Sequence, residues 1–408
     1  MEYEIRSVSA DELEEFRRCQ ASAFGNEFST DHLEAGRQIF EAERSLAAFD
    51  DGRIIGTSGI FSFELTVPGG DPVKAAGVSM VSVKPTHRRR GVLTGIMARQ
   101  LAAVRDRGEA LAILWASESA IYGRFGYGIA TQMELLRVPH EYGAMRRDVP
   151  PSAGRLRLLS ADEARELLPA LHERARRLSP GAVSRTAGWW EIRIFRDHPD
   201  HRGGYGSNNY LVYEEGGEIA GYLIYRRRDD SVGWIPGGKA LVRECVPATK
   251  EAYAALWRYV LELDLVQEIE YDIASGNEPL LWMLEDSRRT ERRRLDAIWL
   301  RVVDVEKALS ARAYGGEGRL VIEVEDAVLE GAGGRFELVA GLGDGICRRT
   351  DEAPDLVMGA SELGSLYLGG GSAWALWRAG RIAGGEHAVA LAERLFGWHV
   401  PPHCQEHF

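Results

Sequence analysis

One segment, Val81-Ser-Val-Lys-Pro-Thr-His-Arg-Arg-Arg-Gly-Val-Leu, constrains the fold of this chain more than any other. Apolar alternation between Val78 and Val83 predicts a strand that ends at Pro85, and apolar spacing from Val92 to Val104 predicts a helix. Arginines before a helix are electrostatically unfavourable by themselves, because the N-terminal end of the helix dipole is already positive. Their placement is explained if an anion binds at the turn.

The basic turn therefore predicts a phosphate-bearing ligand. Backbone N–H groups of the first helical turn would point at phosphate oxygens, and Arg88, Arg89 and Arg90 would add positive charge. Gly91 has no Cβ and allows a close approach of the backbone. The alternative is a solvated charge cluster, but the order strand, proline, Arg-x-x-Gly and helix favours a ligand site. The turn matches neither a Walker loop nor the Gly-x-Gly-x-x-Gly of dinucleotide folds.

A second unit follows at Leu114-Trp-Ala-Ser-Glu-Ser-Ala-Ile-Tyr-Gly-Arg-Phe-Gly-Tyr-Gly128. Residues Leu111 to Trp115 predict a short strand, and Ser117 is the expected N-cap of a helix that includes Ile121. Three glycines end that helix soon afterwards. The unit therefore places two tyrosines, Tyr122 and Tyr127, shortly after a strand end.

The basic turn resembles motif A of the GNAT N-acetyltransferases, whose Arg-x-x-Gly-x-Gly/Ala turn grips the pyrophosphate of acetyl-CoA. Leu93 departs from the small residue at the last position. Combined with Ile-Tyr-Gly-Arg-Phe-Gly-Tyr-Gly, the turn resembles the Eis family of GNAT-type aminoglycoside and amine acetyltransferases. Chain length agrees, as does the aromatic terminus Pro401-Pro-His-Cys-Gln-Glu-His-Phe408. The resemblance spans the chain and is most specific over 78–128 and 354–408.

The resemblance implies acetyl-CoA as co-substrate and no metal. The backbone of Val81 and Val83 would pair with pantetheine, and Ser117 would be a further contact near the cofactor. The pyrophosphate would be held by the residues of the turn, Arg88, Arg89, Arg90, Gly91 and Leu93.

Acetyl transfer requires a neutral amine, a donor for the oxyanion and a proton for the leaving thiolate. Tyr122 and Tyr127 could each donate that proton, and the resemblance selects Tyr122 as general acid. His87 lies in the phosphate turn and is expected to face solvent. The resemblance makes the terminal carboxylate of Phe408 the base, whereas a frayed tail is the usual fate of a terminus. The two prolines and the aromatic end favour a docked tail.

The fold class expected from these patterns is α/β and α+β. Tandem GNAT folds with a degenerate second copy would be followed by an α+β domain resembling a sterol carrier protein. The expected bounds are 1–148, 149–299 and 300–408. In the first copy, two strands at 45–49 and 53–65 are expected to be joined by Asp50-Asp51-Gly52, a type I′-like hairpin signal. The second copy repeats the strand, hairpin, strand and helix order, but Ala-Thr-Lys-Glu (248–251) replaces His-Arg-Arg-Arg-Gly. In the third part, 355–368 is expected to be helical.

Composition limits the class of partner. The formal net charge of −11 disfavours nucleic acid and favours cationic small-molecule amines. The four cysteines are scattered without zinc spacing, which predicts reduced thiols, no metal and a cytoplasmic protein. The sequence has no apolar run long enough to predict a membrane span. The resemblance implies a homo-oligomer, specifically a hexamer.

Three functions remain open from the sequence. The leading one is N-acetylation of cationic small molecules such as aminoglycosides. The alternatives are acetylation of a protein or peptide lysine, and a non-catalytic sensor that binds acyl-CoA or lipid.

Overall fold

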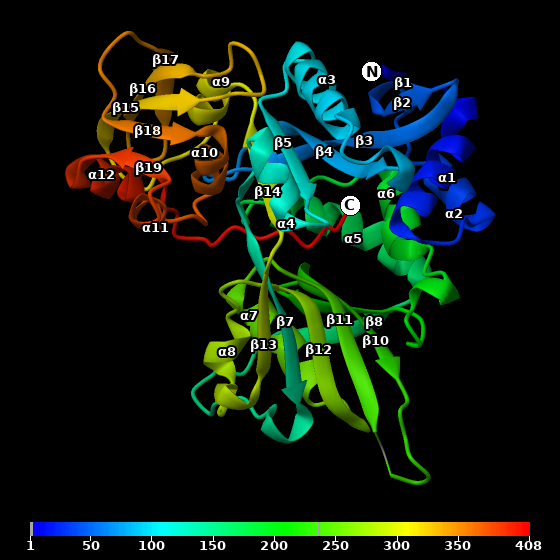
Figure 1. Ribbon diagram of the computed structural model, residues 1–408. Helices are drawn as coiled ribbons and strands as arrows, with labels where there is room; N and C mark the ends of the chain where they lie inside the picture. Colours follow the sequence, from blue (N-terminus) through cyan, green and yellow to red (C-terminus); the bar gives the residue numbers. More distant parts are fainter. Residues whose placement is uncertain (1–2, 236) are drawn as a thin grey trace. The chain divides into compact units, whose positions relative to one another are not determined.

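The computed structural model describes residues 3–235 and 237–408, which form two structural units (Figure 1). Unit 1 contains the chain up to Thr131, Ala297–Pro402 and Glu406–Phe408, and unit 2 contains Gln132–Asp296 and His403–Gln405. Within the described residues, unit 1 has a seven-stranded and a five-stranded sheet, and unit 2 has a seven-stranded sheet. No helix in this part of the chain is both long and apolar enough to cross a membrane.

The first sheet of unit 1 has the strand order β1-β2-β3-β4-β5-β14-β6. Its strands are β1 (Glu4–Ser7), β2 (Leu46–Asp50), β3 (Arg53–Thr66), β4 (Pro72–Val83), β5 (Leu111–Trp115), β14 (Ile298–Val302) and β6 (Gly128–Ile129). Its helices are α1 (Leu13–Phe24), α2 (Thr30–Arg37), α3 (Val92–Asp106) and α4 (Ser119–Tyr122). The strand, basic turn and helix predicted from the sequence are confirmed as β4, the turn and α3.

Helices α1 and α3 pack on opposite faces of this sheet. Ala47 and Phe49 of β2 belong to the core that contains α1, whereas Ala48 between them belongs to the core that contains α3. Such alternation is the period-2 pattern of a strand buried on both faces. The preceding hairpin is also confirmed, because Asp51 (φ 46°) and Gly52 (φ 72°) both have the positive φ of a type I′ turn.

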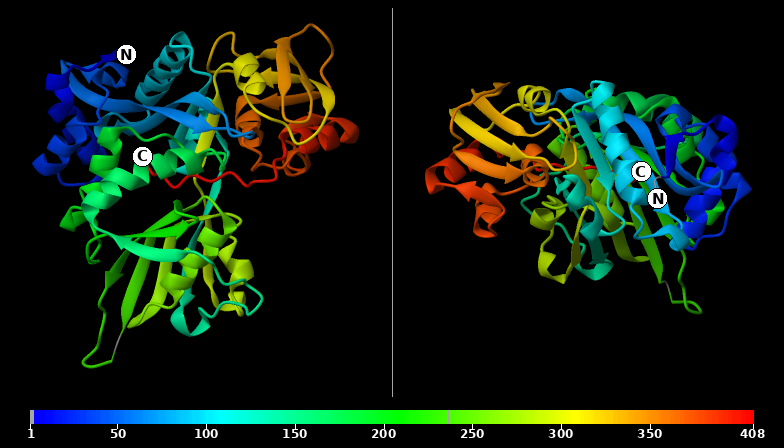
Figure 2. Two further views of the ribbon diagram at one scale, coloured as in Figure 1. Left: turned by 180° about the vertical axis from the view of Figure 1, so that it is seen from behind. Right: turned by 45° about the horizontal axis from the view of Figure 1, so that its top comes forward.

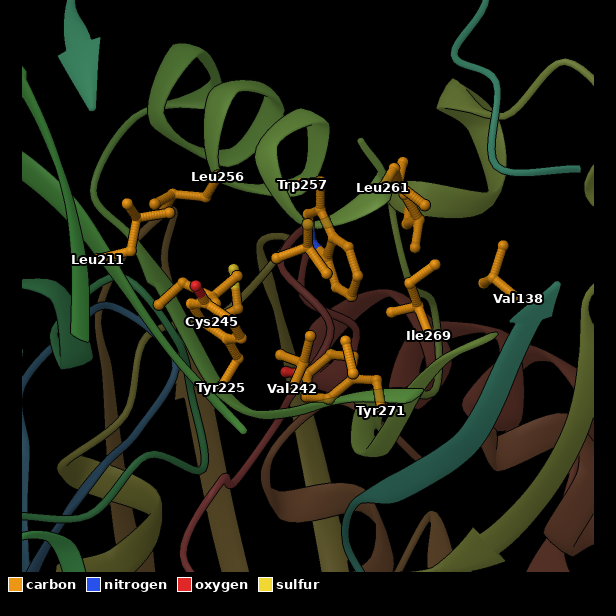
Figure 3. Close-up of a cluster of buried hydrophobic side chains, with 14 of the residues drawn as sticks. Val138, Leu211, Tyr225, Val242, Cys245, Leu256, Trp257, Leu261, Ile269 and Tyr271 are labelled. Atoms are coloured by element: carbon orange, nitrogen blue, oxygen red, sulfur yellow. The ribbon is translucent and has the colours of Figure 1, made fainter. Parts of the chain in front are cut away.

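Unit 2 has a sheet of order β13-β7-β12-β11-β10-β9-β8. Its strands are β7 (Gln132–Pro139), β8 (Arg155–Leu159), β9 (Asn209–Glu215), β10 (Glu218–Arg228), β11 (Gly238–Pro247), β12 (Val266–Ser275) and β13 (Glu291–Asp296). Its helices are α5 (Ala161–Arg176), α6 (Ala187–Trp189), α7 (Lys250–Leu261) and α8 (Leu280–Met283). The core between α7 and the sheet is built around Trp257, with Val242, Cys245 and Tyr271 on the strand side (Figure 3).

The two seven-stranded sheets have the same strand order, but their sixth strands are exchanged. β14 follows unit 2 in the chain and lies between β5 and β6 in unit 1. β7 follows the first copy in the chain and lies between β12 and β13 in unit 2. The repeat inferred from the sequence is therefore present, with one strand of each sheet supplied by the other half of the chain.

The five-stranded sheet of unit 1 has the order β17-β16-β15-β18-β19 (Figure 2, yellow to orange). Its strands are β15 (Gly318–Glu325), β16 (Gly334–Ala340), β17 (Gly345–Arg349), β18 (Leu356–Gly359) and β19 (Ile382–Gly384). Its helices are α9 (Val305–Ser310), α10 (Ala360–Tyr367), α11 (Ala373–Arg378) and α12 (Glu386–Phe396). The helical prediction for 355–368 is wrong over its first part, because Leu356–Gly359 pairs in parallel with β15.

Candidate active site

The strands β4 and β5 diverge in the middle of the first sheet. They pair in parallel only as far as Val78 and Leu114, while β4 continues to Val83 with β3 as its partner. A register shift opposite Thr57 and Gly59 contains Met80, whose φ is 54°. This bulge turns β4 away from β5. The edge of β4 beyond Val78 therefore has no strand partner in the described part of the chain, and an extended amide ligand could pair there.

The basic turn opens the N-terminus of α3. Gly91 is the N-cap with φ 83°, and a Cβ there would meet nothing within 4 Å. Among the described residues, no side chain caps the first turn of this fifteen-residue helix, so its N–H groups are available to an anion. Leu93 supplies one of these N–H groups, and its side chain packs toward the core of the α3 face.

The three arginines of the turn are all exposed. Arg88 donates from Nη2 to the Ala23 carbonyl at 2.9 Å, which ties the turn to the end of α1. Arg89, with φ 61°, and Arg90 have no hydrogen bond or ion pair within residues 3–235 and 237–408. The structure thus brings the predicted phosphate residues together on an open basic turn, and phosphate binding stays a prediction.

His87 does not face solvent as expected. Its side chain is 18% exposed, and Nε2 lies 3.0 Å from Oδ2 of Asp50. The adjacent Tyr3 ring packs edge-on against the imidazole. Asp50 lies at the end of β2, so the His87–Asp50 contact connects the turn to the β2–β3 hairpin. The Nε2 atom of His87 is therefore already occupied by Asp50.

Tyr122 is buried at the end of the short helix α4, with 4% of its surface exposed. Burial raises the pKa of its phenol, and a hydrogen bond with the Ser117 hydroxyl opposes that shift. Tyr122 is therefore protonated at neutral pH, as a proton donor must be. Ser117 is not the N-cap predicted from the sequence: Glu118 holds that position in an extended conformation, and Ser117 precedes it.

Tyr127 is fully buried, and its ring packs edge-on against Tyr122 at 6.2 Å. Its hydroxyl has no hydrogen-bond partner in the described part of the chain. Burial raises the pKa of Tyr127 far above its usual range. Tyr127 is enclosed by core residues and contributes packing. Tyr122 is the less enclosed of the two tyrosines.

The end of the chain is docked in unit 1. The indole of Trp115 donates to the Glu406 carbonyl at 2.7 Å, and its ring packs against His407 at 4.9 Å. The Phe408 ring lies 5.0 Å from the ring of Phe63 and is 9% exposed. The tail therefore packs against β3 and against the last residue of β5, where β5 and β4 have separated.

Tyr122 and Phe408 approach this divergence from opposite faces of the sheet. Tyr122 packs with Val78 and Leu114 in the core of the α3 face. Phe63 lies two residues after Phe61, which packs with the α1 core, so strand alternation places Phe63 on the α1 face. A buried phenol and the chain terminus consequently flank the same strand ends.

Sequence reasoning missed the residues that hold the tail, Trp115 and Phe63. Both are aromatic residues on strands, which is ordinary for a sheet, so their type carried no signal. No group of three or more His, Cys, Asp or Glu side chains suited to a metal converges within residues 3–235 and 237–408.

Family models agree with this geometry. A model described as acetyltransferase (GNAT) domain matches residues 4–130, and a second with the same description matches 181–302. A sterol carrier protein domain matches residues 305–405. The fold class predicted from the sequence is confirmed, and the protein is an acetyltransferase of the GNAT class, whose members use acetyl-CoA.

Relatives narrow the class further. An uncharacterized N-acetyltransferase of Streptomyces avermitilis is 38% identical over 356 residues, which cover 87% of this chain and 86% of that protein. N-acetyltransferase Eis of Mycobacterium tuberculosis is 36% identical over 339 residues, covering 81% and 79%. The crystal structure of Eis1 from Mycobacterium abscessus has a TM-score of 0.88 at 34% identity, covering 99% and 100%. The chain belongs to the Eis family of N-acetyltransferases.

Proposed function

We propose that this acetyltransferase transfers acetyl from acetyl-CoA to amines of cationic small molecules such as aminoglycosides. The observation that carries the proposal is the docked terminus, which packs at the divergence of β4 and β5 on the face opposite Tyr122. The net charge of −11 favours the approach of a cationic acceptor.

The residues of the first sheet fit acetyl-CoA. The backbone of Val81 and Val83 offers amide groups along an edge that no strand of the described chain pairs with, which suits the amides of pantetheine. Arg88, Arg89 and Arg90 with the N-terminus of α3 suit the pyrophosphate. Ser117 adds a hydroxyl near Tyr122. Bound there, acetyl-CoA supplies an activated thioester carbonyl.

Tyr122 acts as the general acid. The substrate nitrogen forms a bond to the thioester carbon, and the carbon–sulfur bond breaks as the amide forms. The phenol proton of Tyr122 passes to the departing sulfur, so the product is the free thiol of CoA. The buried phenol suits this role because it stays protonated across neutral pH.

The α-carboxylate of Phe408 acts as the base. With a reference pKa of about 3.5 it is anionic at neutral pH, so it can bind the substrate ammonium and accept its proton directly or through water. After attack the nitrogen gives up a second proton, which replaces the proton that Tyr122 delivers to sulfur, and the first proton leaves Phe408 for solvent. Approach from the α1 face leaves the opposite face to the acid.

A thiol-release assay with untagged protein tests this function. Acetyl-CoA would be offered with aminoglycosides, polyamines and lysine peptides, and the products would be weighed by mass spectrometry. We expect release with aminoglycosides and one or more added acetyl groups. Release with peptides only would reassign the protein to peptide acetylation, and binding of CoA without release would favour a sensor. We also propose a cytoplasmic homohexamer, for which light scattering would give six times the chain mass of 45.2 kDa.

A further inference from the structure

Unit 2 has the same strand divergence as the first sheet, but the chain itself fills it. The parallel strands β11 and β12 pair only as far as Val242 and Tyr271. Beyond that point, two residues of the terminal segment, residues 401–408, bind the separated strands. Gln405 binds Cys245 on β11, and His403 binds Ile273 on β12.

Gln405 makes two hydrogen bonds to one residue of β11. The Cys245 N–H donates to the Gln405 side-chain oxygen at 3.0 Å, and the Gln405 side-chain nitrogen donates to the Cys245 carbonyl at 2.9 Å. The Cys245 side chain is buried in the core of unit 2, which fixes the direction of its backbone (Figure 3). A side-chain amide thus pairs with this edge as another strand would.

Cys245 corresponds to Val81 of the first copy. Each lies three residues beyond the last residue of its strand that pairs with the parallel neighbour, Val242 in β11 and Val78 in β4. Val81 is a residue to which we assign a pantetheine amide. Gln405 therefore presents one carbonyl and one N–H group at the place where a pantetheine amide would present the same two groups.

His403 closes the other side of the divergence. Its Nε2 donates to the Ile273 carbonyl at 3.0 Å, and its backbone N–H donates to the Pro180 carbonyl at 2.8 Å. Gly181, with φ +92°, allows this contact, because a Cβ there would lie 3.1 Å from the His403 carbonyl oxygen.

The described residues of the second copy also form no anion site at the corresponding helix N-terminus. Thr249 is the N-cap of α7, and its hydroxyl accepts from the Ala252 N–H at 3.1 Å. The corresponding N-terminus of α3 has no side-chain cap from any described residue. The second copy thus has a capped helix and an occupied strand edge where the first copy has an open helix and a free edge.

We propose that Gln405 and His403 occupy the cofactor position of the second GNAT copy and thereby anchor the terminal segment whose last residue, Phe408, serves the first copy. The inference rests on the proposed role of Phe408. Gln405 and His403 are positioning residues, and each chain binds one acetyl-CoA.

Gln405→Leu tests the anchor, because leucine keeps much of the side-chain volume and removes both hydrogen bonds. Gln267→Leu is the matched control, since Gln267 is exposed at the start of β12, whereas His403 binds Ile273 near its end. Hydrogen exchange of the peptides covering β11 and 399–408 reports docking independently of activity. We expect faster exchange in Gln405→Leu, a kcat lowered by about tenfold to a hundredfold, and a KM for acetyl-CoA within about twofold.

The outcomes separate the anchor from the function. Unchanged exchange in Gln405→Leu would overturn the anchor whatever the rate. If deletion of Phe408 abolishes turnover but Gln405→Leu shows faster exchange with an unchanged kcat, then Gln405 does not position Phe408. If deletion of Phe408 also leaves kcat unchanged, the proposed base is wrong. Native mass spectrometry that finds two acetyl-CoA molecules per chain would overturn occupation of the second site.

Discussion

The pair Tyr122→Phe and Tyr127→Phe separates chemistry from packing. Both substitutions remove one buried hydroxyl from neighbouring rings of the same core, which pack edge-on at 6.2 Å. Only the Tyr122 hydroxyl has a hydrogen-bond partner, Ser117, while the Tyr127 hydroxyl has none in the described residues. Tyr122→Phe should therefore lower both the rate and the stability, whereas Tyr127→Phe should lower neither.

Tyr122→Phe should lower kcat by about 10² to 10⁴, the usual contribution of a general acid. At about 1.4 kcal/mol for each factor of ten, this adds about 3 to 5 kcal/mol to the activation barrier. Loss of one neutral hydrogen bond should lower the free energy of unfolding by only about 1 kcal/mol. The rate effect thus exceeds the stability effect, and acetyl-CoA affinity should change little.

Tyr127→Phe should leave kcat within about threefold of the wild type. Its hydroxyl is buried without a partner, which costs about 1 to 3 kcal/mol, so its removal should leave the free energy of unfolding equal or higher. Initial rates from a thiol-release assay and thermal melts of both variants test the argument. Full activity in Tyr122→Phe, or an equal loss of rate in Tyr127→Phe, would refute the assignment of the acid.

Three further predictions address the turn, the tail and the core. Arg89→Ala with Arg90→Ala should raise the KM for acetyl-CoA by about tenfold or more for each arginine that binds phosphate, and should reduce the salt dependence of KM, with kcat largely kept. Burial lowers the pKa of His403 to about 4 from 6.5, so docking of the tail is fully stabilised above pH 6.5 and loses up to about 3 kcal/mol as pH falls toward 4. The protection factors of 399–408, which remove the intrinsic pH dependence of amide exchange, should fall over this range, and His403→Gln should abolish that fall. Glu109→Gln leaves buried Arg44 without its counter-charge at 2.5 Å, so thermal melts should show a loss of about 3 to 5 kcal/mol.

Local patterns predicted the local parts of the fold. The β2–β3 hairpin follows from Asp51 and Gly52, and α3 follows from apolar spacing after Gly91. Two local errors arose at element ends. Ser117 stands one residue before the cap of α4, and Leu356–Gly359 is an apolar run too short to separate from the helix that follows it.

The long-range parts could not be read from periodicity. An apolar segment such as 298–302 reads as a strand, but its sequence does not say that Trp299 pairs with Leu114. The same holds for β7, which joins the second sheet. The division of the tail between the two units could not be predicted for the same reason. Gln405 is bound in unit 2 and Phe408 packs in unit 1, and neither partner is close in sequence.

Extending the chain by one residue beyond Phe408 tests the catalytic role of the Phe408 carboxylate most directly. The extension keeps the Phe408 ring and replaces its carboxylate with a neutral amide, while the charge moves one residue further. We expect kcat with aminoglycosides to fall at least a hundredfold while acetyl-CoA binding, measured by calorimetry, is unchanged. Full turnover by the extended protein would contradict a catalytic terminus.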